Sequence, residues 1–83
     1  MTTPRPRVTL YSRPGCHLCD AAREVVARVC DDLGETWDEI DIDQDADLAD
    51  RFGEEVPVTF VDGRQHDYWR VDERRLRAAL TTR

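Results

Sequence analysis

Two cysteines separated by two residues, Cys16 and Cys19, are the part of this sequence best suited to chemistry. An apolar segment at 8–11 comes before them and a helical pattern of apolar residues at 18–33 follows, so the pair lies where a strand passes into a helix. A helix N-terminus has unpaired N–H groups and a partial positive charge, which stabilise a thiolate. We therefore expect the Cys16 thiol to ionise below the free-cysteine pKa of about 8.5, with Cys19 one turn further along and within reach of the Cys16 sulfur.

This placement favours a dithiol that exchanges with disulfides: Cys16 attacks and forms a mixed disulfide, and Cys19 resolves it. The alternative is a non-catalytic module that binds a metal, a cluster bridging two chains, or a protein partner through the same pair. A tetrahedral zinc site takes four ligands, and the other soft ligands are His17, Cys30 and His66. Cys30 lies about 16 Å beyond Cys19 along a helix at ~1.5 Å per residue, so a single-chain site would also need His66.

The neighbours of the pair leave several roles open. An imidazolium at His17 would stabilise the Cys16 thiolate, but His17 is equally well a solvent-facing spacer. Asp20 is better explained as an acidic residue of the first helical turn than as a catalytic base. Cys30 falls on the apolar stripe of the helix and is expected to pack as a small apolar residue.

The composition points to one small domain, 1–83, with a loose tail at 1–6. The net charge is −6, and the segment 31–55 carries 12 acidic residues against one arginine, which disfavours nucleic-acid binding and is interpreted as a solvated acidic face. No apolar run approaches the ~20 residues of a membrane span, and the N-terminus lacks an apolar signal region. We expect a monomer in a reducing cytoplasm, where a CxxC pair is more often catalytic or metal-binding than structural.

The pattern of apolar, turn and capping residues predicts alternating strands and helices. In chain order we expect a strand at 8–11, a helix at 16–33, a strand at 37–42, a helix at 46–52, strands at 56–61 and 64–71, and a helix after Asp72. Gly34 is the expected C-cap of the first helix, and Asp62-Gly63 is a strong hairpin signal. The order is βαβ, then a helix, then ββα.

Two side-chain placements follow from these periods. Leu18 begins the apolar stripe of the first helix, together with Ala22, Val25 and Val29. Alternation along the last strand puts only one of Tyr68 and Trp69 in the core, and Trp69 is the one we favour.

Over 8–80 the chain resembles the thioredoxin-fold redoxins, and within them the glutaredoxins, most of all short bacterial glutaredoxin-like proteins with a Tyr-Ser-Arg-Pro-Gly-Cys-His-Leu-Cys segment. The resemblance rests on Cys16-His17-Leu18-Cys19 after the first strand, on the Val56-Pro57 step, and on a β-hairpin followed by a C-terminal helix. It implies an α/β fold of the thioredoxin/glutaredoxin type: a four-stranded mixed sheet, with the strands in the order second, first, third, fourth, and helices on both faces. It also implies a cis Val56–Pro57 bond.

The resemblance further implies a thiol–disulfide oxidoreductase that acts on protein or small-thiol disulfides. No cofactor is expected, and the electron donor would be glutathione, another low-molecular-weight thiol or a flavoprotein reductase. Arg13 matches the basic residue that often precedes the motif, Asp72 could meet the ammonium of a ligand, and His17 is the third candidate side chain for substrate binding. The backbone groups of Val56, next to Pro57, would pair with an extended substrate. The chain departs from glutathione-using members because it has no Gly-Gly pair before the last helix, where bulky rings stand instead.

Overall fold

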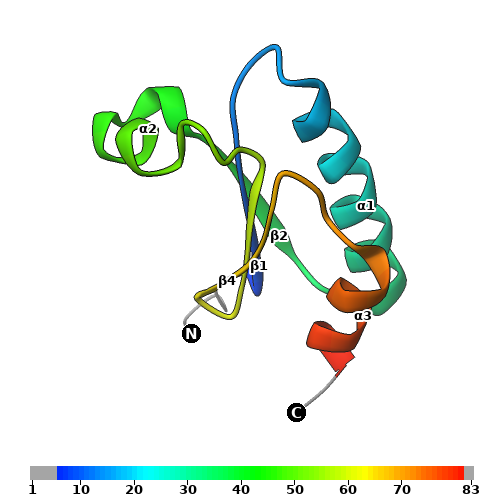
Figure 1. Ribbon diagram of the computed structural model, residues 1–83. Coiled ribbons are helices and arrows are strands. Elements are labelled where there is room, and N and C mark those ends of the chain that lie inside the picture. Colours follow the sequence, from blue (N-terminus) through cyan, green and yellow to red (C-terminus); the bar gives the residue numbers. More distant parts are fainter. Residues whose placement is uncertain (1–5, 82–83) are drawn as a thin grey trace.

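Figure 1 shows the computed structural model, which describes residues 6–81; most of the expected N-terminal tail, 1–5, lies outside them. The elements are, in order, β1 (Val8–Ser12), α1 (His17–Leu33), β2 (Trp37–Asp41), the 3₁₀ helix η1 (Ile42–Gln44), α2 (Ala46–Phe52), β3 (Val58–Val61), β4 (Arg64–Tyr68) and α3 (Glu73–Thr81). The predicted sequence of strands and helices is confirmed, and η1 is an addition that ends β2 one residue early.

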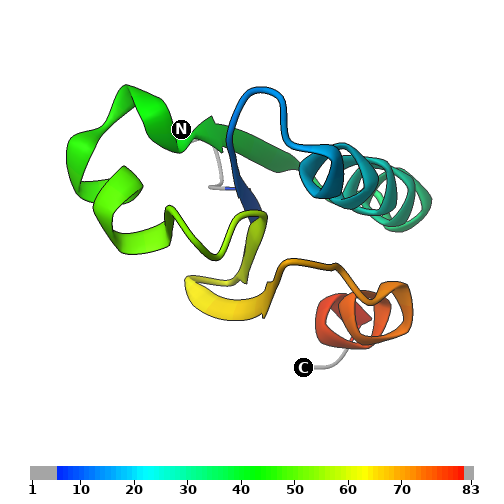
Figure 2. The same ribbon diagram turned by 45° about the horizontal axis from the view of Figure 1, so that its top comes forward.

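The four strands form one mixed sheet in the order β2-β1-β3-β4. β1 runs parallel to β2 and antiparallel to β3, and β3 and β4 form an antiparallel hairpin. Figure 2 shows α1 and α3 on one side of the sheet and α2 on the other. This is the thioredoxin/glutaredoxin-type architecture that the resemblance implied.

Helices cover the sheet because each buries an apolar face against it. On one side, side chains of α1 and α3 pack on β1 and β3; the buried members are Val8, Val26, Val29, Cys30, Val61, Leu76 and Leu80. On the other side, Ile42, Phe52 and Val58 form a smaller cluster. Burial of such side chains supplies roughly 1.5–3 kcal/mol each relative to exposure, which is why the sheet needs both layers.

The ends of α1 are set by its caps; the C-cap at Gly34 was predicted, and the helix begins at His17, one residue later than predicted. Cys16 is the N-cap residue in an extended conformation, and Gly34 ends the helix at φ 68° in the left-handed region that glycine adopts without a steric penalty. Asp72 caps α3, since its Oδ1 accepts a hydrogen bond from the Arg75 N–H at 3.1 Å. The strand–helix junction therefore places Cys16 at the tip of α1.

Three placements differ from prediction. β3 begins at Val58 rather than at Val56, after a cis Val56–Pro57 bond of the kind the resemblance implied. β4 ends at Tyr68, and Trp69 adopts φ 66°, which breaks the alternation; our placement of Trp69 in the core is wrong, since it is 51% exposed. Leu18 is 44% exposed although it lies on the predicted stripe, and it lines a groove between α1 and the segment after β4.

Among the described residues, no helix combines the length and the apolar character that a bilayer crossing needs.

Candidate functional site

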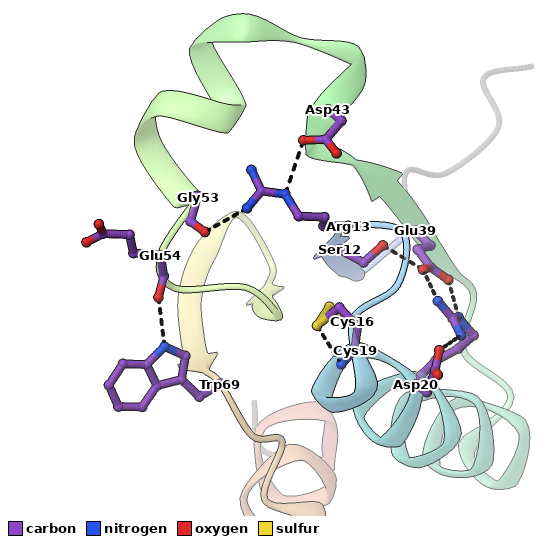
Figure 3. The surroundings of a disulfide bond; sticks show 11 residues. Ser12, Arg13, Cys16, Cys19, Asp20, Glu39, Asp43, Gly53, Glu54 and Trp69 are labelled. Atoms are coloured by element: carbon purple, nitrogen blue, oxygen red, sulfur yellow. Dashed lines mark hydrogen bonds and ion pairs between the residues drawn. A yellow bond between two sulfur atoms is a disulfide. The ribbon is translucent and has the colours of Figure 1, made fainter.

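Cys16 and Cys19 form a disulfide, with their Cα atoms 5.1 Å apart. Cys16 is half-buried and Cys19 is completely buried, so Cys16 is the more accessible of the two residues. The Cys16 Sγ accepts a hydrogen bond from the Cys19 N–H at 3.1 Å, as a side chain does at a helix N-cap (Figure 3). The free N–H groups of α1 therefore point at the exposed sulfur.

The loop that carries Cys16 is held by Arg13. The Arg13 guanidinium donates to Asp43 Oδ1 and to the Gly53 carbonyl, both at 3.1 Å, so it joins the loop to the two ends of the η1–α2 segment (Figure 3). Gly15 turns the loop at φ 76°, a conformation that favours glycine. Arg13 lies in the loop next to Cys16, and its charge is paired with Asp43 of η1 rather than directed at the disulfide.

A polar network that the sequence did not reveal lies next to Cys19, on the side of the dithiol that faces β2 (Figure 3). Arg23 on α1 donates to both carboxylate oxygens of Glu39 at 2.6 Å and to Asp20 at 2.8 Å. Ser12, at the end of β1, donates to Glu39 at 2.6 Å. The hydrogen bonds from Arg23, and to a smaller extent from Ser12, hold the pKa of Glu39 below its usual 4.5 although partial burial opposes this. The network ties α1, β1 and β2 together beside the dithiol.

The spacing of Asp20 and Arg23 was a visible sign of this network, since residues three apart on a helix are neighbours. The third partner, Glu39, comes from a strand, and the sequence does not say which strand residue faces the helix. The arginine also neutralises Asp20, which would otherwise oppose a thiolate at Cys16.

The segment around the cis proline lies at the same end of the sheet as the disulfide loop, because Val58 pairs with Tyr11 near the end of β1. The Val56 N–H donates to the Phe52 carbonyl at 3.1 Å, so one of the two backbone groups expected to meet substrate is already used. No N–H of residues 6–81 donates to the Val56 carbonyl, which remains available to an incoming chain.

Trp69 closes this side of the site. Its backbone N–H donates to the Pro57 carbonyl at 2.8 Å and its indole N–H donates to the Glu54 carbonyl at 3.0 Å (Figure 3). Tyr68 packs edge-on against it, with ring centroids 5.1 Å apart. Trp69 and the residue after it occupy the turn in which the sequence lacks a Gly-Gly pair, so a wide ring stands where the backbone would otherwise be open.

The remaining predicted residues lie at the edges of this region. His17 is exposed at the start of α1, next to Cys16. The carboxylate of Asp72 is occupied in capping α3. Within residues 6–81, no three histidine, cysteine, aspartate or glutamate side chains are grouped so as to hold a metal ion.

Cys30 lies outside the site. It is a free thiol, 1% exposed, in the cluster between α1 and the sheet, as predicted. Burial, with a smaller contribution from the charge of Glu35, raises the pKa of this thiol above its usual range, which favours the neutral form of the thiol at neutral pH.

A family model described as "Glutaredoxin-like domain (DUF836)" matches residues 7–81. An uncharacterized protein of Mycobacterium tuberculosis is 43% identical over 81 residues, an alignment that covers 92% of this chain and 84% of that protein. A Dictyostelium discoideum protein named as glutaredoxin-like is 35% identical and is aligned over 90% of this chain and 75% of its own length.

Solved structures share the architecture. A protein from X. campestris superposes with a TM-score of 0.75 at 39% identity, covering 92% of this chain and 97% of that one. A glutaredoxin from Archaeoglobus fulgidus superposes with a TM-score of 0.63 at 17% identity, covering 92% of this chain and 87% of its own, and this likeness bears on the fold alone.

Proposed function

This chain belongs to the glutaredoxin-like domain family, and from that membership and the geometry of its dithiol we propose that it is a thiol–disulfide oxidoreductase. Cys16 is the attacking sulfur and Cys19 the resolving sulfur. The substrates are disulfides on proteins or on small thiols.

The reaction begins with the reduced dithiol. The Cys16 thiolate attacks one sulfur of the substrate disulfide; the S–S bond breaks, and the leaving thiolate takes a proton from water. The Cys19 thiol then loses its proton and attacks the Cys16 sulfur, which releases the second substrate thiol. Two electrons pass from the dithiol to the substrate, and the protein ends with the Cys16–Cys19 disulfide, the oxidation state of this structure.

One observation carries the proposal: the sulfur of Cys16 is the N-cap of α1 and accepts the Cys19 N–H at 3.1 Å. A negatively charged sulfur accepts such a bond more strongly than a neutral one and gains from the positive end of the helix. The same contact therefore stabilises the Cys16 thiolate before attack, and again when Cys16 is the leaving group as a donor thiol reduces the oxidised protein.

A further turnover needs a reductant for the disulfide. We propose that it is supplied in a reducing cytoplasm by a low-molecular-weight thiol or by a flavoprotein reductase. Glutathione is the less suitable thiol here, because Trp69 fills the turn where close backbone approach would be needed and the Val56 N–H is occupied.

The test is a single-turnover reaction between the reduced protein and a protein disulfide, with no other reductant present. We expect one substrate disulfide to be reduced for each Cys16–Cys19 disulfide formed. Addition of glutathione, of a second small thiol, or of a thioredoxin-type reductase with NADPH then identifies the donor from the recovery of turnover. Substrate that stays oxidised with the wild-type protein would contradict the proposal.

A further inference from the structure

An apolar groove of about 350 Å³ lies beside the disulfide loop, between α1 and the segment that joins β4 to α3. Leu18 and Val25 line it on the helix, and Trp69 and Val71 line it on the segment. Of the four large apolar side chains that residues 6–81 expose, three gather here: Leu18, Trp69 and Tyr68 next to it. An exposed apolar groove next to a reactive group is typical of a surface that receives a partner.

The aromatic wall of this groove is rigid. Trp69 is held by hydrogen bonds from its backbone and from its indole, although its φ of 66° is costly for any residue but glycine. Side chains that are already ordered lose little entropy on binding, which is why tryptophan and tyrosine are common contact residues at interfaces. The groove therefore does not have to form when a partner arrives.

The opposite flank of the disulfide loop has a different character. The acidic segment, 41–55, carries seven carboxylates and one arginine, a formal charge of −6. Figures 1 and 2 show α2 on one side of this loop and α1 on the other, and Arg13 ties the loop to both ends of the acidic segment. Its Asp47 and Asp50, both on α2, are exposed and form no ion pair with any described residue.

Positive charge, by contrast, lies at the groove. Arg70 lines it and is exposed, so a cationic side chain is disfavoured there and an apolar one is accommodated. Between the two flanks, the carbonyl of Val56 is open to one N–H of an extended chain. Cys16 therefore has an apolar groove on one side and an acidic segment on the other.

We propose that the substrate disulfide lies in an extended protein segment with a bulky apolar residue on one side of the reactive cysteine and lysine or arginine residues on the other. The apolar side chain enters the groove, and the cationic residues face the acidic segment. Complementary charge speeds encounter and fixes orientation. This inference rests on the proposed function and narrows its substrate class from any disulfide to cationic protein segments; glutathione, which has two carboxylates, lacks both features.

The test uses three peptides that carry the same mixed disulfide beside a leucine and differ on the other flank: two arginines, two glutamines or two glutamates. The second-order rate constant for reaction with the reduced protein is measured at low salt and at physiological salt. We expect the arginine peptide to react about tenfold or more faster than the glutamate peptide at low salt, with the difference shrinking as salt rises.

Variants locate the two features. The double variant Asp47→Asn, Asp50→Asn should lose most of the charge preference. A control with the same change in charge, made at exposed acids of α1 (Glu24→Gln, Asp31→Asn), should keep it.

For the groove, Leu18→Ala should slow the leucine peptide severalfold but not a glycine peptide, whereas Ile40→Ala, at another exposed apolar residue, should slow neither. Peptide rates that do not depend on flanking charge, or a charge preference that survives the double variant, would overturn the inference. So would a stable dimer that hides Trp69. A small neutral disulfide distinguishes failure of this inference from failure of the proposed function. If the protein reduces it but shows no preference among the peptides, only the inferred substrate class is wrong. If the protein does not reduce it either, the proposed function is wrong.

Discussion

All three cysteines lie on or at the tip of one helix, yet α1 offers them two opposite surroundings. At its first turn, Cys16 is half-buried and meets a backbone N–H, an arrangement that favours the charged form of sulfur. Eleven residues past Cys19, Cys30 is packed among apolar side chains, which favours the neutral form. The position of a thiol along a helix and against a sheet, rather than the residue type, therefore decides whether it reacts.

Cys16 and Cys19, both in the first turn of α1, are expected to differ most in the effect of replacement by serine. Cys19→Ser should attack a protein disulfide and remain joined to it, because the resolving sulfur is missing, whereas Cys16→Ser should form no adduct at all. Mass spectrometry of the reaction mixtures measures the adducts. If both variants trapped the substrate equally, the burial of Cys19 would not determine which cysteine attacks and which resolves the mixed disulfide.

The contrast between the helix tip and the middle of the helix is measured by alkylation. In the reduced protein at neutral pH, Cys16 should react with iodoacetamide about a hundredfold faster than Cys30, which is exposed only when the structure opens locally. Peptide mapping by mass spectrometry gives the rate for each cysteine. In denaturant the alkylation rates of Cys16 and Cys30 should converge, which is the control for intrinsic reactivity. Comparable rates in the folded protein would contradict the difference in surroundings that we infer for the two thiols.

Replacement of the buried thiol separates packing from chemistry. Cys30→Ala should keep the full rate of disulfide reduction and lose about 1 kcal/mol of unfolding free energy, because a small buried group is removed from a packed cluster. Urea denaturation and the single-turnover assay measure the two quantities. A variant that folds normally but no longer reduces disulfides would show that Cys30 takes part in the reaction.

The smallest expected effect concerns the charge near the helix tip. Arg23→Met keeps the length of the side chain but leaves Asp20 unneutralised, so the pH midpoint of Cys16 alkylation should rise by a few tenths of a unit. Arg28→Met is the matched control, because it removes an arginine of α1 that pairs with Glu73, away from the dithiol. Equal shifts in the two variants would point to net charge rather than to Asp20.

The same variant has a defined pH dependence of stability. Glu39 has a lowered pKa in the folded protein, so it contributes stability above its ordinary value of 4.5, and this contribution is lost as the pH falls through the lowered value. Arg23→Met removes the main cause of that lowering. Its deficit in unfolding free energy against wild type should therefore be present at pH 7 and shrink near pH 3, as measured by urea denaturation.

Sequence patterns predicted the elements because local signals agreed with the fold. The N-cap at Cys16, the C-cap at Gly34 and the hairpin at Asp62-Gly63 are each determined by a few neighbouring residues, and all three are present. The cis bond before Pro57 came from resemblance alone, since an X-Pro bond is usually trans.

What escaped prediction depends on contacts between distant parts of the chain. Alternation along β4 could not show that Trp69 leaves the strand. Its conformation is held by hydrogen bonds to the carbonyls of Pro57 and Glu54, which lie in the segment that leads into β3. Helical periodicity placed Leu18 on the buried stripe but does not show that a groove against residues 69–71 leaves it exposed. The partnership of Arg23 with Glu39 has the same origin, since it joins a helix to a neighbouring strand.

The position of Trp69 has an optical consequence. The chain has two tryptophans: Trp69 lines the groove beside the dithiol, and Trp37 lies on the far side of α1's length, against a hollow that it shares with Cys30. An excited indole near a disulfide loses emission by electron transfer to the sulfur. We therefore expect the fluorescence of Trp69 to rise when the pair is reduced, while that of Trp37, which lines a different hollow, stays nearly constant. Tryptophan emission would then report the oxidation state of the pair without an attached label.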